Sequence, residues 1–278
     1  MWCIHSAIRN IVHGARNHSL MRTLFLVLLL AHLVLTDETD NKYFHEPGED
    51  DLHRHYDTRF FTDLVSDEER QLTLRAIIRA YLLLFENFQL ETWIAHGTLL
   101  GWYWNGSILP WDWDLDVQVT NATLAALAQS HNHTSHEYHS PELNITRRYL
   151  LDINPWSWER VRGDGANIID GRFIDVSNGM FLDITGLAAN DPDTTDIIEC
   201  KNEHRYNSSD IFPLRESLFE GVSAKVPYAY AHVLAEEYSN LALTQTNFHD
   251  HNFDTNQGEW QKVTVEGEEA TPEGGAYS

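Results

Sequence analysis

The sequence has little cysteine and little positive charge. Its 278 residues include 2 cysteines, Cys3 and Cys200, which lie on opposite sides of an apolar segment, so we expect no disulfide between them. The same count excludes a cysteine-rich zinc site. Lysine and arginine number 19 against 42 aspartates and glutamates, which gives a net charge of −23. This charge argues against a protein that binds nucleic acid through a basic surface.

Acidic residues are also absent from the start of the chain, before Asp37. This region contains several arginines and then the apolar run Leu24–Leu35, which is shorter than the about 20 residues that span a bilayer as a helix. A basic flank, a short apolar core and a polar sequence after it are typical of a secretory signal. A longer anchor that begins near Ile11 is the alternative. We therefore predict a signal peptide or a signal anchor, and thus a possible membrane anchor, over residues 1–36.

Sequons for N-glycosylation follow this segment. Each alone is weak, because N-x-S/T arises often by chance, but together with a signal-like start they predict a protein of the secretory pathway. We expect the Golgi lumen as the compartment. The five sequons begin at Asn105, Asn121, Asn132, Asn144 and Asn207.

The two ends of the remaining chain differ in composition from its middle. Residues 37–65 are rich in Asp, Glu and His, which predicts an acidic stem or linker rather than a packed element. Residues 256–278 are acidic and rich in glycine, which predicts a disordered tail. We therefore expect the folded domain to cover residues 66–255.

Within that domain the hydrophobic pattern predicts both helices and strands, which indicates an α+β fold. Ser66 and Glu69 form a capping box before apolar residues at helical spacing. Further helices are expected over 98–104, after Asn121 and over 228–238. The histidine-rich residues 131–140 are expected to form a solvated loop. Strands are expected over 92–95, along the acidic motif that follows Pro110, and over 147–153, 172–176 and 181–185.

The acidic motif consists of Asp112, Asp114 and Asp116 at alternate positions. On a strand these side chains share one face, while Leu115 and Val117 point to the other face. Three like charges aimed at one place require a cation, and carboxylate oxygens suit Mg²⁺ or Mn²⁺. The motif therefore predicts a metal site. An EF-hand that begins at Asp112 is excluded, because its sixth and twelfth positions require Gly and Glu. This sequence has Val117 and Thr123 there.

Two further features belong to the same prediction. His96, Gly97 and Thr98 form a short glycine loop before the motif, and such loops hold phosphate groups at helix N-termini. Asp183 interrupts an otherwise apolar strand, so it is either paired with a cation or functional. Asp175, on the preceding expected strand, is a weaker candidate for the same role.

These motifs resemble those of a known family. The run HGTLLGxxxxxxxLPWDxDxDV resembles the LicD/fukutin-like group of the nucleotidyltransferase superfold, although a typical member has a second Asp at Trp113. The runs FLDITGL and DIFPLRESLFEGVSAKVP resemble later blocks of the family, in the right order. The run RFIDVSNGMFLDITGLA resembles the sequences of the fungal Mnn4-like branch, which is linked to mannosyl phosphorylation of cell-wall glycans. The resemblance covers roughly residues 66–254.

The resemblance implies a mixed β-sheet flanked by helices and a particular set of site residues. Asp114, Asp116 and Asp183 match the family's catalytic carboxylates. The implied metal ligands are these three with Asp112, and the implied donor-binding residues are His96, Gly97 and Thr98.

The leading hypothesis is a metal-dependent phosphotransferase. It moves a phospho-sugar, such as mannose phosphate, or a phospho-alcohol from a CDP- or GDP-linked donor to a glycan hydroxyl. The first alternative is a glycosyltransferase with a D-x-D metal site, which shares the metal but does not need the glycine loop. The second alternative is a non-catalytic regulator of glycan phosphorylation that has kept the fold.

Overall fold

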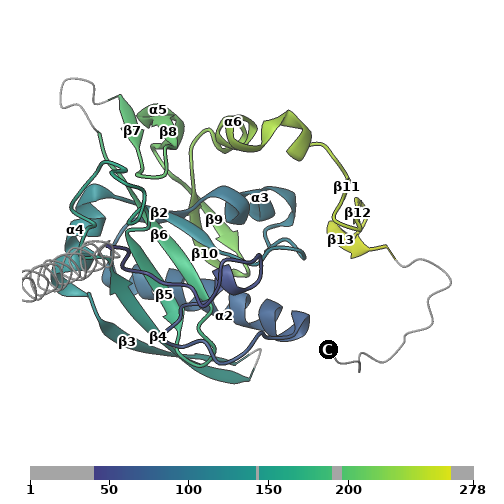
Figure 1. Cartoon of the computed structure of the whole chain (residues 1–278). Helices are drawn as coiled ribbons and strands as arrows, with labels where there is room; N and C mark the ends of the chain where they lie inside the picture. Colours follow the sequence, from purple (N-terminus) through teal and green to yellow (C-terminus); the bar gives the residue numbers. More distant parts are fainter. Residues whose placement is uncertain (1–40, 142–143, 190–195, 264–278) are drawn as a thin grey trace, which may run out of the picture. The chain divides into compact units, whose positions relative to one another are not determined.

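The fold is built on one mixed sheet with strand order β1-β2-β6-β5-β4-β3 (Figure 1). Only the pair β2–β6 is parallel, and the other neighbours are antiparallel. The computed structural model describes residues 41–141, 144–189 and 196–263. The strands are β1 (Thr92–Ile94), β2 (Asp116–Thr120), β3 (Thr134–Ser140), β4 (Ile145–Ile153), β5 (Gly171–Asp175) and β6 (Phe181–Leu187).

Helices flank this sheet, as the α+β prediction requires. The expected capping box begins the longest one, because the Ser66 hydroxyl accepts a hydrogen bond from the Glu69 backbone N–H at 3.3 Å. The helices are η1 (His53–His55, a 3₁₀ turn), α2 (Asp67–Phe88), α3 (His96–Asn105), α4 (Asn121–Ser130), α5 (Ser208–Ile211) and α6 (Tyr230–Ala242). The mixed sheet with flanking helices confirms the predicted fold class.

Three small antiparallel sheets complete the described chain (Figure 1). The first two are β7 (Ile197–Glu199) with β8 (Arg205–Asn207), and β9 (Arg215–Phe219) with β10 (Val222–Val226). The third joins β11 (Asn247–Phe248), β12 (His251–Asp254) and β13 (Glu259–Lys262).

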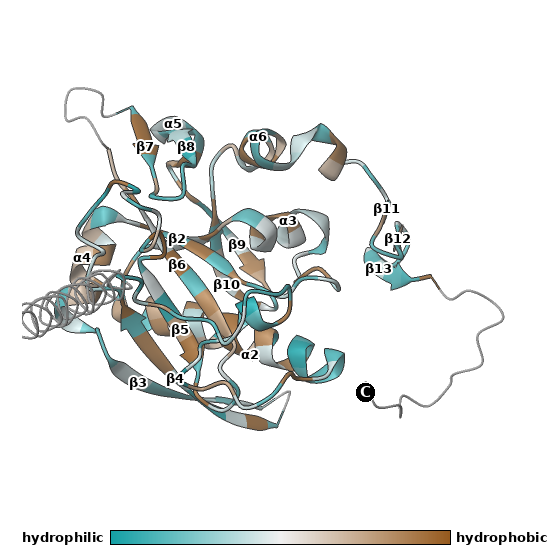
Figure 2. Ribbon diagram, viewed as in Figure 1, coloured by the Kyte–Doolittle hydropathy of each residue, from teal (hydrophilic) through white to brown (hydrophobic). Residues whose placement is uncertain are grey.

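The core lies between α2 and the sheet. Trp93, Tyr81, Tyr149 and Phe173 are fully buried there, and burying each large apolar side chain contributes about 1.5–3 kcal/mol. In Figure 2 the strands β4, β5 and β6 carry much of the hydrophobic colouring, which agrees with the burial of every residue of β5.

The prediction of a solvated loop over residues 131–140 is wrong for its last seven residues. Residues 134–140 form the edge strand β3, paired with β4. Alternate side chains, including those of His136 and Tyr138, are half-buried, while Glu137 between them is exposed. His136 packs against Phe88 of α2, with ring centroids 5.7 Å apart. Burial alternates along this segment as in an edge strand, but the half-buried positions hold polar residues such as Thr134 and His136. The sequence therefore shows no alternation of apolar and polar residues that would predict a strand.

The predicted boundaries of the folded domain are too narrow at both ends. One compact unit begins at Lys42, and Phe44, Tyr56 and Asp57 are buried in it, so residues 42–65 are not an extended stem. At the other end, Trp260 of β13 is buried, so the predicted disordered tail is ordered over Glu259–Lys262. Residues 264–278 of that tail lie outside the described residues.

The predicted signal peptide or anchor, residues 1–36, also lies outside the described residues. Among the residues that the structure does describe, no helix has the length and apolar character needed to cross a membrane.

Candidate functional site

Two of the three aspartates of the acidic motif lie in the loop that leads into β2. Only Asp116 belongs to the strand, so the prediction that Asp112, Asp114 and Asp116 share one strand face is wrong. The buried guanidinium of Arg70 on α2 fixes the loop. It donates to the carbonyl oxygen of Pro110 at 2.8 Å and to that of Asp112. A buried cation bonded to main-chain carbonyls therefore sets the path of the acidic loop.

Trp113 packs on the same arginine. Its ring lies 4.8 Å from the Arg70 guanidinium carbon and stacks on His55 at 6.0 Å between centroids. This cation–π contact gives Trp113 a structural role, at the position where a typical family member has an aspartate.

The sheet brings Asp116 and Asp183 side by side. They are register partners on the parallel strands β2 and β6, so both side chains point to the same face. The rival Asp175 is buried elsewhere and accepts hydrogen bonds from Arg147 at 2.9 Å and Ser177 at 2.6 Å. Asp175 therefore has a structural pairing, and Asp183 is the carboxylate that joins the acidic motif.

The glycine loop begins α3 beside these carboxylates. The Asp116 backbone N–H donates to the Thr98 hydroxyl at 2.9 Å. A Cβ atom on Gly97 would lie 3.1 Å from an Asp112 carboxylate oxygen, which is tighter than usual contact, so glycine allows the close approach. His96 has a φ of 50°, a left-handed conformation that costs a non-glycine residue about 1–2 kcal/mol. Such strain often marks functional sites.

The charges on these carboxylates are poorly compensated. Burial, followed by the charge of Asp114, raises the pKa of Asp112 well above its usual range. Burial and the neighbouring charges of Asp114 and Asp183 raise the pKa of Asp116 to about 8, against an opposing effect of His96. Burial likewise raises the pKa of Asp183 to about 6, although Arg172 opposes the shift. The site therefore has negative charge in excess of its cations.

This donor set fits a hard divalent cation, which prefers carboxylate oxygens. Over the described part of the chain, however, no three His, Cys, Asp or Glu side chains already converge on a point that could hold a metal ion. Asp114 is exposed on its loop, next to the strand pair that carries Asp116 and Asp183. A bound cation would therefore require movement of side chains, with the loop residue Asp114 free to turn toward it.

Three cavities meet at Asp114. The N-terminal cavity, about 630 Å³, also contains Lys42, Arg54, His55, Arg172 and Asp183. The polar cavity, about 810 Å³, includes His96, Asp116, Asp183, Arg205 and Glu237. The aromatic cavity, about 420 Å³, is lined by Asp112 and Asp116 together with Trp104, Trp111, Tyr238, Phe248 and Trp260.

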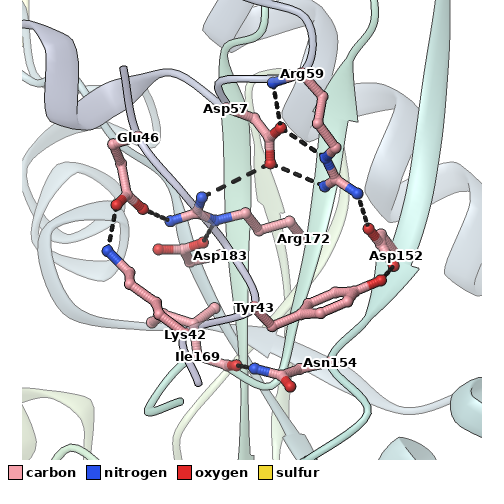
Figure 3. A network of polar contacts seen from close by, with 10 residues as sticks. All are labelled: Lys42, Tyr43, Glu46, Asp57, Arg59, Asp152, Asn154, Ile169, Arg172 and Asp183. Atoms are coloured by element: carbon pink, nitrogen blue, oxygen red, sulfur yellow. Dashed lines mark hydrogen bonds and ion pairs between the residues drawn. The ribbon is translucent and has the colours of Figure 1, made fainter. Parts of the chain in front are cut away.

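Arg172 connects residues 42–65 to the site, and sequence reasoning missed it (Figure 3). Its guanidinium donates to Asp183 at 2.9 Å and to Glu46 at 2.6 Å. Asp57 lies 3.8 Å from the same guanidinium and is held in turn by Arg59. Figure 3 shows these groups as one network, so residues 42–65 support the position of Asp183.

Glu237 of α6, the partner of His96, is a second residue of the site that sequence reasoning missed. One of its carboxylate oxygens lies 3.0 Å from His96 Nδ1, and the other accepts from the Tyr206 hydroxyl at 2.7 Å. Burial alone would lower the pKa of His96, but Glu237 and Asp116 together raise it. The protonated form of His96 is therefore favoured beside the acidic loop. Glu237 occupies an ordinary helical position with no local motif, so only the fold could reveal it.

Comparison with known proteins agrees with this architecture. The family model described as "LicD/FKTN/FKRP, nucleotidyltransferase domain" matches residues 89–229, half of the chain. Mannosyltransferase regulator 4 of Saccharomyces cerevisiae is 34% identical over 195 residues, which are 67% of this chain and 16% of that protein. Mannosyltransferase regulator 14 of the same yeast is 36% identical over 138 residues, 48% of this chain and 14% of that protein. The chain thus spans only a small part of these curated relatives.

Proposed function

The chain belongs to the LicD/FKTN/FKRP nucleotidyltransferase-domain family, and from that premise we propose that it is a metal-dependent phosphotransferase of glycan modification. One observation carries the proposal most strongly. The fold places Asp183 beside Asp116, and next to the loop that holds Asp114, at the meeting point of three cavities. Carboxylates held at the edge of open cavities, with few cations to balance them, are suited to a metal-assisted reaction on phosphates.

In this proposal Asp114, Asp116 and Asp183 hold Mg²⁺ or Mn²⁺, with Asp112 as a further ligand. When bound, the cation neutralises the donor diphosphate and the charge that develops on the transferred phosphoryl group. The backbone N–H groups of Gly97 and Thr98, at the N-terminus of α3, hold oxygens of the transferred phosphoryl group, beside the aspartates that the cavities share.

The chain's remaining groups serve the donor and the acceptor. The donor is a CDP- or GDP-linked phospho-sugar or phospho-alcohol. Its diphosphate lies near the cations of two cavities, which are Lys42 and Arg172 in the N-terminal cavity and His96 in the polar cavity. The glycan hydroxyl attacks the phosphorus, its proton passes to a site carboxylate such as Asp183, and the nucleoside monophosphate leaves.

Incubation of the purified protein with Mn²⁺, a mannan acceptor and a panel of CDP- and GDP-linked donors tests this function. We expect one donor to release its nucleoside monophosphate and to leave a phosphodiester on the acceptor. Both products should disappear when EDTA removes the cation. A plain glycoside with release of nucleoside diphosphate would instead identify a D-x-D glycosyltransferase.

The names of the yeast relatives favour a second candidate, a non-catalytic regulator. A regulator would release no monophosphate from any donor by itself, yet it would stimulate a partner transferase when added to it. The two candidates therefore give opposite results in the donor panel and in a stimulation assay.

We also propose that the protein works in the lumen of the secretory pathway, with the Golgi as the expected compartment. The sequon asparagines Asn105, Asn121, Asn144 and Asn207 are exposed, and a glycan could be attached there without unfolding. Treatment with an endoglycosidase should lower the apparent mass of the protein made in a eukaryotic host. Replacing all five sequon asparagines by glutamine should abolish that shift, and an unshifted wild-type protein would contradict secretory entry.

A further inference from the structure

We propose that the aromatic cavity binds a pyranose ring of the acceptor glycan, a subsite assignment that rests on the proposed function. Its walls come from three places in the chain: Trp104 of α3, Trp111 before the acidic loop, and Phe248 and Trp260 of the β11–β13 sheet. The apolar C–H face of a sugar ring packs on indole rings, while its hydroxyls need polar partners. The cavity offers both kinds of surface.

The aromatic rings form a continuous wall. Ring centroids of Trp111 and Trp260 lie 4.9 Å apart, and those of Trp104 and Trp260 lie 5.0 Å apart. Phe248 extends the wall from Trp111, at 5.5 Å. All three contacts are edge-to-face, so ring faces remain for a ligand to contact.

Trp260 provides an independent sign of a ligand. Its side chain is buried, with 8% exposed, yet its indole Nε1 has no hydrogen-bond partner among the described residues. A buried donor left unpaired costs about 1–3 kcal/mol, so nearly all such groups in folded proteins are paired. Nε1 itself has almost no exposed surface, so a sugar hydroxyl would accept this hydrogen bond once the indole edge turns toward the cavity.

The charge of the lining selects a neutral ligand over a phosphorylated one. Considering the residues that the structure describes, no lysine or arginine lines the aromatic cavity, whereas Asp112, Asp114 and Asp116 all do. These carboxylates can accept hydrogen bonds from sugar hydroxyls but repel phosphate groups. The N-terminal cavity contains Lys42, Arg54 and Arg172 and therefore suits the diphosphate of the donor better. The donor and acceptor would then meet at Asp114, which lines both cavities.

The position of this wall in the chain favours a role in specificity. Tyr238, Phe248 and Trp260 come after residue 229, where the match to the family model ends. Figure 1 shows the β11–β13 sheet on the other side of the central sheet from α4, reached through α6. The carboxylates thus belong to the shared domain, while half of the aromatic cavity is added by the chain beyond it.

Sugar binding can be measured without turnover, by calorimetry and ligand-observed NMR with mannotriose, glucotriose and galactotriose. We expect the wild-type protein to bind at least one of them. Trp111→Leu should bind it roughly tenfold more weakly, because one stacking surface is lost. Trp260→Phe keeps the ring but removes the N–H, and it should also weaken binding, by several-fold. The matched control is Trp158→Leu, because Trp158 is 72% exposed and lines none of the three cavities.

Binding of GDP-mannose and CDP in Mn²⁺ provides the second arm of the experiment and should not change in either cavity variant. Three results would overturn the proposal: no saturable binding of any trisaccharide, unchanged sugar binding in Trp111→Leu and Trp260→Phe, or loss of nucleotide binding in those variants. The last result would place the nucleobase in the aromatic cavity. Failure of the proposed function gives a different pattern, in which sugar binding depends on both tryptophans but no donor releases monophosphate.

Discussion

Asp116→Asn is expected to abolish phosphotransfer while leaving the protein folded. Asparagine has nearly the same shape but lacks the charge that holds a divalent cation, so we expect the transfer rate to fall roughly 100-fold or more. The Asp116 backbone N–H still bonds the Thr98 hydroxyl, and the strand register with β6 does not depend on the side-chain charge. The same loss is expected for Asp114→Ala.

The stability of Asp116→Asn should equal or exceed that of the wild-type protein in the absence of metal. Burial and the charges of Asp114 and Asp183 disfavour the Asp116 carboxylate in the folded protein, and a neutral amide removes that cost. Monophosphate release in saturating Mn²⁺ and urea unfolding in EDTA measure the two effects. Asp63→Asn is the matched control, because Asp63 is exposed and lines none of the three cavities. Near-normal turnover by Asp116→Asn would refute the assignment of the metal ligands.

Local sequence patterns predicted the parts of the fold and the site that depend on short-range order. The capping box at Ser66 and the apolar spacing after it predicted α2, and the single carboxylate within the apolar run 181–185 made Asp183 a candidate for the site. The choice between Asp183 and Asp175 followed from chemistry, because a charge between apolar neighbours needs a partner. The structure assigns Asp175 to Arg147 and places Asp183 beside Asp116.

The parts that could not be predicted depend on contacts between distant segments. Arg172 and Glu46 are 126 residues apart in sequence, and His96 and Glu237 are 141 apart. Nothing in the local sequence of either partner indicates such a pair. The same reason explains the error over residues 42–65, whose acidic composition is typical of a linker. Several of those acidic side chains are ion-paired to arginines in the folded protein, as Asp57 is to Arg59.

The acidic loop illustrates a different limit. The alternation of Asp112, Asp114 and Asp116 fits a strand. However, the carbonyl oxygens of Pro110 and Asp112 accept hydrogen bonds from the Arg70 side chain instead of from a neighbouring strand. A strand needs these groups for its ladder. The aspartates are therefore brought near one another by a loop that leads into a strand pair, and Asp114 in that loop is exposed and able to turn toward a ligand.

Arg172→Met should cause the largest loss of stability, about 3 kcal/mol or more. The Arg172 side chain is buried and hydrogen-bonded to Asp183 and Glu46, with Asp57 close by. Removing one partner of a buried ion pair leaves uncompensated charge, which typically costs about 3–5 kcal/mol. Lys42 still pairs with Glu46 and Arg59 with Asp57, so Asp183 is the carboxylate left without a cation. Urea unfolding in EDTA measures the loss with no metal to replace the arginine.

A second substitution tests whether the unpaired charge of Asp183 is the cause. Adding Asp183→Asn to Arg172→Met should recover part of the lost stability, because the amide no longer requires a counter-ion. Arg148→Met is the matched control: Arg148 is exposed, lies 4.0 Å from the exposed Glu137, and should change stability by about 0.5 kcal/mol or less. Equal unfolding midpoints for Arg172→Met and Arg148→Met would show that the network in Figure 3 does not hold the N-terminal segment against the site. A double variant no more stable than Arg172→Met would instead assign the loss to packing, since the Arg172 guanidinium also lies 3.7 Å from the centre of the Phe181 ring.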